Sequence, residues 1–170
     1  MKTLIYSILT GVTIIILFAS CENEKENAEQ FDLSGKIISH SDCKSYKSDS
    51  VLLISASSSC AEYSFDATTN RLHIKHINAG FNCCPDSLYC TVKISNDTII
   101  IQEFETEQLC NCSCLYDLVI EIEGVGSQKY QIKFIEPYCG NQEQIIFGVD
   151  FPIQKQGLYC VTRNHYPWGK

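Results

Sequence analysis

Eleven cysteines are the residues of this 170-residue chain with the most evident capacity for chemistry. Cys110, Cys112 and Cys114 alternate with single residues, and Cys83 and Cys84 are adjacent. Thiolates at such short spacing can form a soft-metal site. However, no C-x-x-C pair is matched by a second one to complete a tetrahedral zinc site, and in an exported chain oxidation competes with metal for every thiol. We therefore expect structural disulfides and no metal.

The pairing of these cysteines is constrained only in part. In an extended chain Cys83 and Cys84 point to opposite sides, so each is expected to bridge to a different element. If Cys21 is set aside for the reason given below, ten cysteines remain and can form five disulfides with no free thiol, but their connectivity cannot be deduced. The ten candidates are Cys43, Cys60, Cys83, Cys84, Cys90, Cys110, Cys112, Cys114, Cys139 and Cys160.

The histidines do not form a metal clamp. His73 and His76 fall in one predicted strand, where a spacing of three places them on opposite faces. We expect His73 to face solvent and His76 to be half-buried with a hydrogen-bond partner. His40 and His165 have no neighbouring carboxylate or nucleophile pattern.

No catalytic residue or cofactor site emerges from the remaining motifs. Glu103 and Glu105 are more typical of a solvated strand face than of a glycosidase pair. The sequence contains no H-E-x-x-H, G-x-S-x-G, phosphate-binding glycine loop or aspartate-rich calcium loop. The tail from Arg163 to Lys170 includes the only tryptophan, Trp168, and is expected to pack against the domain or to be disordered rather than to bind a ligand.

The first twenty residues are predicted to be an export signal. Lys2 provides a positive start, the stretch from Leu4 to Phe18 is mostly apolar, and small residues precede Cys21. The alternative is an uncleaved signal anchor with an unmodified cysteine.

The tetrad Phe18-Ala19-Ser20-Cys21 resembles the lipobox of bacterial lipoproteins. The resemblance implies cleavage before Cys21, a thioether-linked diacylglycerol on its sulfur and an acyl chain such as palmitate on its new amino group. Lipidation of Cys21 would leave an even number of cysteines. Several acyl chains suffice for stable anchoring, so the chain would be attached to a membrane without spanning it.

An acidic segment follows, with four glutamates and no large apolar side chain between Glu22 and Gln30. It is predicted to be a flexible tether, and it is similar to the surface-export signal of lipoproteins in Bacteroidetes-type bacteria; a solvated spacer with no addressing role is the alternative. The predicted organisation is therefore a signal peptide over 1–20, a lipidated acidic tether over 21–30 and one domain over 31–170. A net charge of −7 argues against nucleic acid as a partner.

The elements that must position the cysteines are predicted to be strands. Period-two alternation recurs from residue 31 onward, interrupted by turn-forming segments at 67–70, 95–97, 124–126 and 137–141. Such spacing predicts an all-β fold, an antiparallel sandwich braced by about five disulfides, with a small β-barrel as the alternative. Strands are expected at 33–39, 51–56, 61–66, 71–77, 88–95, 98–105, 112–123, 129–136, 144–151 and 158–162.

The strands at 112–123 and 129–136 are expected to form a hairpin across the Gly124–Ser127 turn. Ile120 and Tyr130 should face the core, while Glu121 and Lys133 should face water. If the first of these strands is regular throughout, Cys110, Cys112 and Cys114 share its inward face.

Tyr116-Asp117-Leu118-Val119-Ile120, followed by Gly124, Tyr130 and Ile132, is similar to the strand, glycine turn and Tyr-x-Ile strand of fibronectin type III and immunoglobulin-like sandwiches. The stretch from Leu72 to Phe134 resembles small cysteine-rich β-sandwich lipoproteins of Bacteroidetes-type cell envelopes. This resemblance implies a sandwich fold and supplies no catalytic residues.

Together these features predict a non-catalytic lipoprotein, anchored by lipid in the bacterial outer membrane and facing the periplasm or the cell surface. Its sandwich would present a binding surface to an envelope protein or a glycan. The alternatives are a small hydrolase, which needs a concave pocket with converging polar groups, and a protease-inhibitor-like module, which needs a stiff loop such as one around Cys83 to Cys90.

Overall fold

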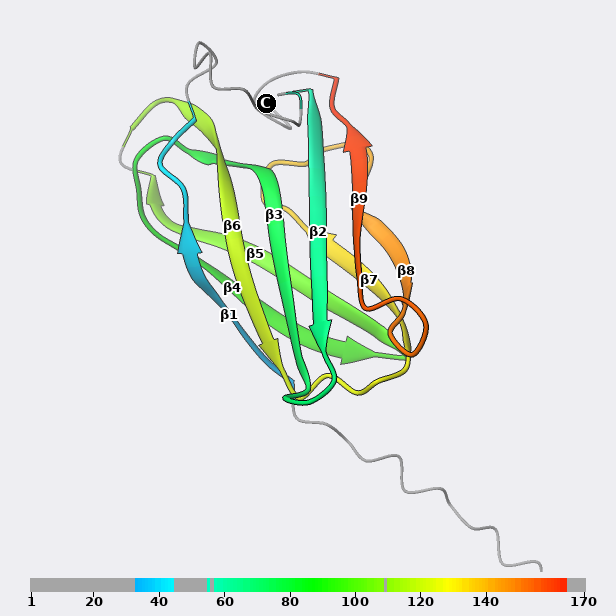
Figure 1. Cartoon of the computed structure of the whole chain (residues 1–170). Coiled ribbons are helices and arrows are strands. Elements are labelled where there is room, and N and C mark those ends of the chain that lie inside the picture. The colour runs from blue at the N-terminus through cyan, green and yellow to red at the C-terminus, as the bar shows by residue number, and fades with distance from the viewer. Residues whose placement is uncertain (1–32, 45–54, 56, 109, 165–170) are drawn as a thin grey trace, which may run out of the picture. The chain divides into compact units, whose positions relative to one another are not determined.

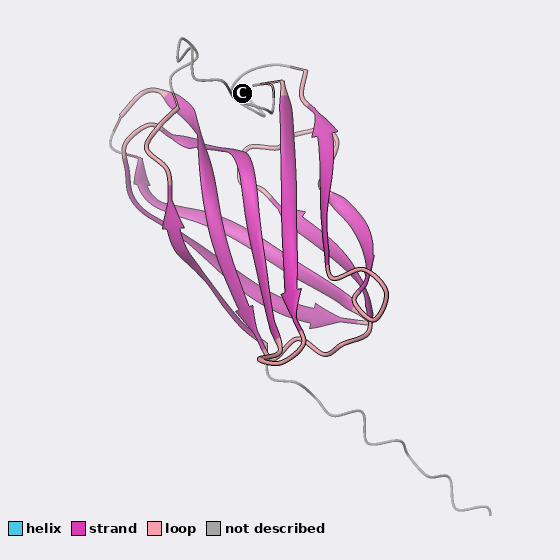
Figure 2. Cartoon of the chain, in the orientation of Figure 1, coloured by secondary structure: helices cyan, strands magenta, loops and turns pink. Residues whose placement is uncertain are grey.

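The computed structural model describes residues 33–44, 55, 57–108 and 110–164, which belong to the compact unit Phe31–Lys170. Nine strands and no helix are found in this part of the chain (Figure 2). None of its segments is therefore a helix long and apolar enough to cross a bilayer. The strands are β1 Ser34–His40, β2 Ser58–Asp66, β3 Arg71–Asn82, β4 Pro85–Ser95, β5 Thr98–Gln108, β6 Ser113–Glu123, β7 Lys129–Ile135, β8 Ile146–Asp150 and β9 Gln156–Thr162.

The strands form two sheets that face each other, as Figure 1 shows. One sheet has five strands in the order β1-β6-β3-β2-β9, and every neighbouring pair in it is antiparallel. The other has four strands in the order β4-β5-β7-β8, with β5 and β7 parallel. No described strand pairs with both sheets, so the sheets do not close into a barrel. The predicted all-β sandwich is confirmed.

The core lies between the sheets and follows the period-two pattern. Along β6 the side chains of Leu118, Ile120 and Ile122 are fully buried, and along β7 Ile132 and Phe134 are at most 1% exposed. Burial of one such side chain stabilises the fold by roughly 1.5 to 3 kcal/mol. The predicted inward face of both strands is therefore confirmed.

Short turns join the strands that do form hairpins. Asn70 lies between β2 and β3, and Asn96 and Asp97 lie between β4 and β5; all three have positive φ angles of 47° to 59°. Asn and Asp tolerate this left-handed region better than most residues. The turn chemistry of the sequence thus predicted these two hairpins.

The expected hairpin of β6 and β7 is wrong, because the two strands lie in opposite sheets. β6 pairs with β1 and β3, whereas β7 pairs with β5 and β8. Their connection crosses between the sheets, with Val125 fully buried and the Gly126 N–H donating to the Tyr130 hydroxyl over 3.2 Å. Alternation fixes which face is buried, and both strands bury that face in the same core from opposite sides. Of the strand expected at 51–56, the structure describes only Ser55, which belongs to no strand. The other residues of that prediction lie outside the described part of the chain.

Candidate functional site

Eight of the ten candidate cysteines form disulfides. The pairs are Cys43–Cys114, Cys60–Cys160, Cys83–Cys112 and Cys84–Cys110.

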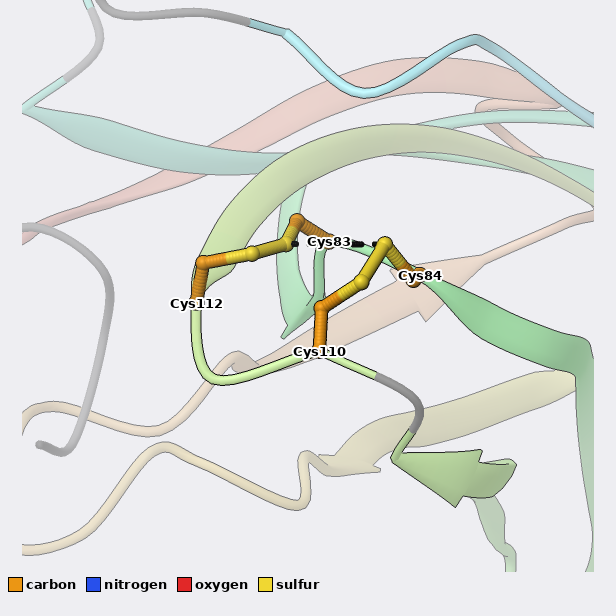
Figure 3. A group of neighbouring side chains, drawn as sticks. All are labelled: Cys83, Cys84, Cys110 and Cys112. Carbon is orange, nitrogen blue, oxygen red and sulfur yellow. Dashed lines mark hydrogen bonds between the residues drawn. A yellow bond between two sulfur atoms is a disulfide. The ribbon is translucent and has the colours of Figure 1, made fainter.

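Two expectations about these cysteines are wrong. Cys83 and Cys84 do not bridge to different elements, because both are bonded to the segment between β5 and β6 (Figure 3). They lie in a bend between β3 and β4, where strand alternation does not apply. Similarly, Cys110 and Cys112 precede the regular part of β6, so they do not share the inward face of Cys114.

Cys90 and Cys139 are unpaired and buried, so the expectation of five disulfides without a free thiol is also wrong. Burial, and then the nearby charge of Glu103, raise the pKa of Cys90 to about 12. Burial raises the pKa of Cys139 as well. The even number of cysteines that remains when Cys21 is set aside is an argument for lipidation of Cys21 only if all of the others pair. Because Cys90 and Cys139 are unpaired, this count does not support lipidation.

A cluster of buried polar side chains lies between the two sheets. His76, on the inward face of β3, is fully buried, and its Nδ1 lies 2.7 Å from Oε1 of Glu103 on β5. Its Nε2 is hydrogen-bonded to the hydroxyl of Ser59 at 2.9 Å and lies 3.7 Å from Oε1 of Glu136. The ring of Phe134 packs against the imidazole with centroids 4.9 Å apart. His76 therefore links both sheets within the core.

Arg163 completes this cluster, which we call the buried charge centre: Ser59, His76, Glu103, Glu136, Cys139 and Arg163. The guanidinium donates from Nη2 to both carboxylate oxygens of Glu136, at 2.6 and 2.7 Å. Its Nη1 donates to the carbonyl oxygen of Glu143 at 2.9 Å and to Sγ of Cys139 at 3.2 Å. Hydrogen bonds between a guanidinium and a carboxylate are charge-assisted and are stronger than those between neutral groups. Thus the end of β9 is held to the segment after β7.

Burial and mutual charge set the protonation of the centre. Burial alone would lower the pKa of His76, but the charges of Glu103 and Glu136 outweigh it and the pKa is raised. Burial raises the pKa of Glu103, although the neighbouring histidine opposes this. The pKa of Arg163 is also raised, because the attraction of Glu136 exceeds the effect of burial. Two cations balance two carboxylates when all four groups are charged.

The expectation of a solvated face at Glu103 and Glu105 is wrong. Glu103 is 2% exposed, and Glu105 is half-buried, with Oε2 accepting from the Asn82 N–H at 2.7 Å and Oε1 accepting from the Tyr138 hydroxyl. His76 has the predicted hydrogen-bond partner but is fully rather than half-buried. The sequence held a signal for Glu103, since it alternates in step with the buried Ile99 and Ile101.

The charge centre has the residue types of a catalytic site but not its access. Four of its side chains belong to residues that are each at most 5% exposed: His76, Glu103, Cys139 and Arg163. Within the described residues, Oε2 of Glu103 has no hydrogen-bond partner. The centre can hold a proton between His76 and Glu103, yet no substrate reaches it in this conformation.

A different set of residues faces outward from the four-stranded sheet. Tyr89 on β4 and Phe104 on β5 are cross-strand neighbours whose rings stack with centroids 5.0 Å apart and planes inclined by 12°. Tyr89 is 42% exposed, and Phe104 is half-exposed. We call this pair and the neutral polar rows on either side of it the aromatic row. Its polar members are the cross-strand pairs Ser87–Thr106 and Thr91–Gln102.

The outward face of the five-stranded sheet is more highly charged. A shallow groove of about 550 Å³ runs over it, lined among others by Glu62, His73, Lys75 and Leu158. The side chain of His73 is 44% exposed, as expected, and Leu158 is 56% exposed. The groove contains neighbouring charges of both signs, which is typical of a solvated sheet face.

Cys21, for which lipid attachment is predicted, lies outside the described residues, as do His165 and Trp168. His40 is exposed and contacts the carbonyl oxygen of Ser41. The chain matches no protein-family model, and neither the curated proteins nor the solved structures contain a significant match to it.

Proposed function

We propose that the protein is a non-catalytic lipoprotein of the bacterial outer membrane that binds a neutral glycan on its aromatic row. Anchoring is inferred from the export signal and from the tetrad ending at Cys21. Four disulfides suit a compartment in which thiols are oxidised.

The observation that carries the binding proposal is the composition of the aromatic row. Sugar rings pack their apolar C–H faces on aromatic side chains, while hydroxyl and amide groups donate to and accept from sugar hydroxyls. Tyr89 and Phe104 supply the rings, and the hydroxyls of Ser87 and Thr106, joined at 2.7 Å, supply exposed polar partners on one side. No carboxylate belongs to the row, which favours a neutral ligand over a cationic one.

We assign no catalysis, because the groups that a hydrolase would use are inaccessible. His76 and Glu103 are 0% and 2% exposed. An inhibitor loop around Cys83 to Cys90 is also disfavoured, since most of that stretch is strand β4 and Cys90 is unpaired.

Binding is tested by affinity electrophoresis of the exported domain through a panel of neutral soluble polysaccharides, such as β-glucan, xyloglucan and mannan. Loss of one stacking aromatic costs about 0.5 to 1.5 kcal/mol, so Tyr89→Ala should weaken binding of a retarding polysaccharide roughly two- to twelvefold. Leu158→Ala, on the other sheet, is the matched control and should leave binding unchanged. No retardation by any neutral polysaccharide, together with capture of an envelope protein that Tyr89→Ala abolishes, would replace the glycan with a protein partner.

Anchoring is tested separately in cells. Globomycin, which blocks lipoprotein signal cleavage, and Cys21→Ala should each change the mass of the protein, and Cys21→Ala should release it from membranes. A mature N-terminus elsewhere without acyl mass would contradict the anchor and leave the binding proposal untouched.

A further inference from the structure

Four cysteine sulfurs gather at one end of the sandwich. Cys83 and Cys84 come from the bend between β3 and β4, and Cys110 and Cys112 come from the segment between β5 and β6 (Figure 3). Their Sγ atoms all lie within 4.8 Å of one another. Among the described residues, this is the one group of three or more metal-ligating side chains that converge in this way. The sulfurs of the other two disulfides do not belong to this group.

The spacing suits four-coordinate thiolate binding. A Zn–S distance of about 2.3 Å places the sulfurs of a tetrahedral site about 3.8 Å apart. Sγ of Cys83 and Sγ of Cys84, which are not bonded to each other, already lie 4.0 Å apart. After reduction, the two sulfurs of each former disulfide must move apart to about 3.8 Å. Each sulfur then moves by less than the length of an S–S bond, which rotation of the cysteine side chain can provide.

Backbone contacts hold the two segments together independently of the sulfur bonds. The Cys83 N–H donates to the carbonyl oxygen of Cys112 at 3.3 Å. The Asn82 side chain donates from Nδ2 to the carbonyl oxygen of Cys110 at 2.6 Å and accepts from the Cys84 N–H at 2.9 Å. Asn82 is itself 2% exposed and is fixed by its N–H bond to Glu105. None of these hydrogen bonds depends on a sulfur–sulfur bond, so they favour close approach of the four cysteines in the reduced chain as well.

A cation can reach this group from solvent. Cys83, Cys84 and Cys110 are half-buried and Cys112 is exposed. A groove of about 280 Å³ borders Cys83 and Cys84 and is also lined by the acidic side chains of Asp42 and Asp86. Carboxylates along such a path attract cations.

We propose that, in the reduced chain, Cys83, Cys84, Cys110 and Cys112 bind one zinc ion as a tetrathiolate. Four thiols bind Zn²⁺ and release four protons, which leaves a site charge of −2. The disulfide form and the zinc form interconvert with balanced electrons: two molecules of a dithiol reductant give four electrons to the two disulfides and become disulfides themselves. Conversely, two molecules of a cyclic disulfide oxidant accept four electrons from the four thiolates, take up four protons to become dithiols, and the zinc ion is released. The four ligands come from the adjacent pair Cys83-Cys84 and from the C-x-C pair Cys110 and Cys112. Neither has the C-x-x-C spacing common in zinc sites, so the sequence pattern alone argued against zinc.

The test uses the whole domain, reduced with a thiol-free phosphine and titrated anaerobically with Co²⁺ and Zn²⁺. We expect one cobalt ion per chain, with the visible absorption of tetrahedral cobalt and thiolate-to-cobalt charge transfer, and its displacement by one zinc ion. The ¹¹³Cd resonance of the cadmium-loaded wild-type chain should fall in the range of four sulfur ligands, which tests the ligand set without any substitution.

Two double variants identify the ligands. Cys110→Ser with Cys112→Ser should lower metal affinity by at least a hundredfold, whereas the matched control Cys60→Ser with Cys160→Ser, which removes a disulfide of the same fold, should retain stoichiometric binding. Absence of stoichiometric metal in the reduced wild-type chain, whether or not it stays folded, would overturn the proposal. A cadmium resonance outside the four-sulfur range, or equal affinity in the Cys110 and Cys112 variant, would overturn it as well.

Discussion

Arg163→Met removes the guanidinium of the buried charge centre and leaves its carboxylates in place. The side chain of Glu136 is 4% exposed, so its carboxylate would lose its arginine partner without gaining contact with water. Breaking a buried ion pair from one side costs about 3 to 5 kcal/mol, because an uncompensated charge stays in the core. Domains of this kind are stable by roughly 5 to 15 kcal/mol, so the loss is large enough to measure.

Urea unfolding with the disulfides intact, followed by far-ultraviolet circular dichroism, measures this free energy. Arg71→Met is the matched control, since Arg71 pairs with Glu123 at 2.8 Å but its side chain is 43% exposed; its loss should cost at most about 1 kcal/mol.

A second comparison isolates the stranded charge. Replacing both partners, as in Arg163→Met with Glu136→Leu, removes both charges and should recover at least about 1 kcal/mol of what Arg163→Met alone loses. The reasoning fails if Arg163→Met costs no more than Arg71→Met, or if the double variant is less stable than Arg163→Met.

Three further outcomes are expected. Alkylation of the unreduced domain, measured by intact mass, should modify Cys90 and Cys139 after denaturation but neither of them in the native state, because both thiols are buried and have raised pKa values. If neither cysteine is modified after denaturation, the two are bonded to each other or to another group. The free energy of unfolding should decrease as pH rises above 6.5, because the pKa of His76 is raised in the folded state: its stabilising contribution is complete below pH 6.5 and is lost as pH rises through the folded pKa. In urea unfolding measured across this pH range, His76→Gln should make the decrease shallower, and an unchanged slope would contradict this assignment. Ile120→Ala should cost about 2 to 5 kcal/mol and Glu121→Ala less than about 1 kcal/mol in thermal melts, with the reverse order refuting the assigned faces.

Local sequence pattern predicted the strands and their buried faces but not their partners. The alternation in β6 and β7 is equally compatible with a hairpin and with two strands in opposite sheets, because either arrangement buries Ile120 and Tyr130. The choice depends on long-range pairing, such as the parallel contact of β5 with β7, which leaves no local signature. Sheet assignment therefore lay beyond what alternation can specify.

The buried charge centre was hidden for a related reason. Glu103 has the register of a core residue, but a carboxylate at a core position is expected only when its partners are known. Those partners, His76 and Arg163, are 27 and 60 positions away along the chain and meet it through the fold, directly and through Glu136. The disulfide pairs were unpredictable in the same sense, since spacing does not encode which distant cysteine approaches.

The disulfide between Cys60 and Cys160 has a mechanical consequence. It joins residues 100 positions apart, and strands β3 to β8 all lie within the loop that it closes. A pulling force applied at the two ends of the domain passes through this bond and bypasses those strands, so about 340 Å of extended chain cannot be drawn out while the bond is intact. Under such an end-to-end force, rupture would begin in the chain outside the loop, whereas a load applied at the aromatic row would enter the loop itself, because β4 and β5 lie within it.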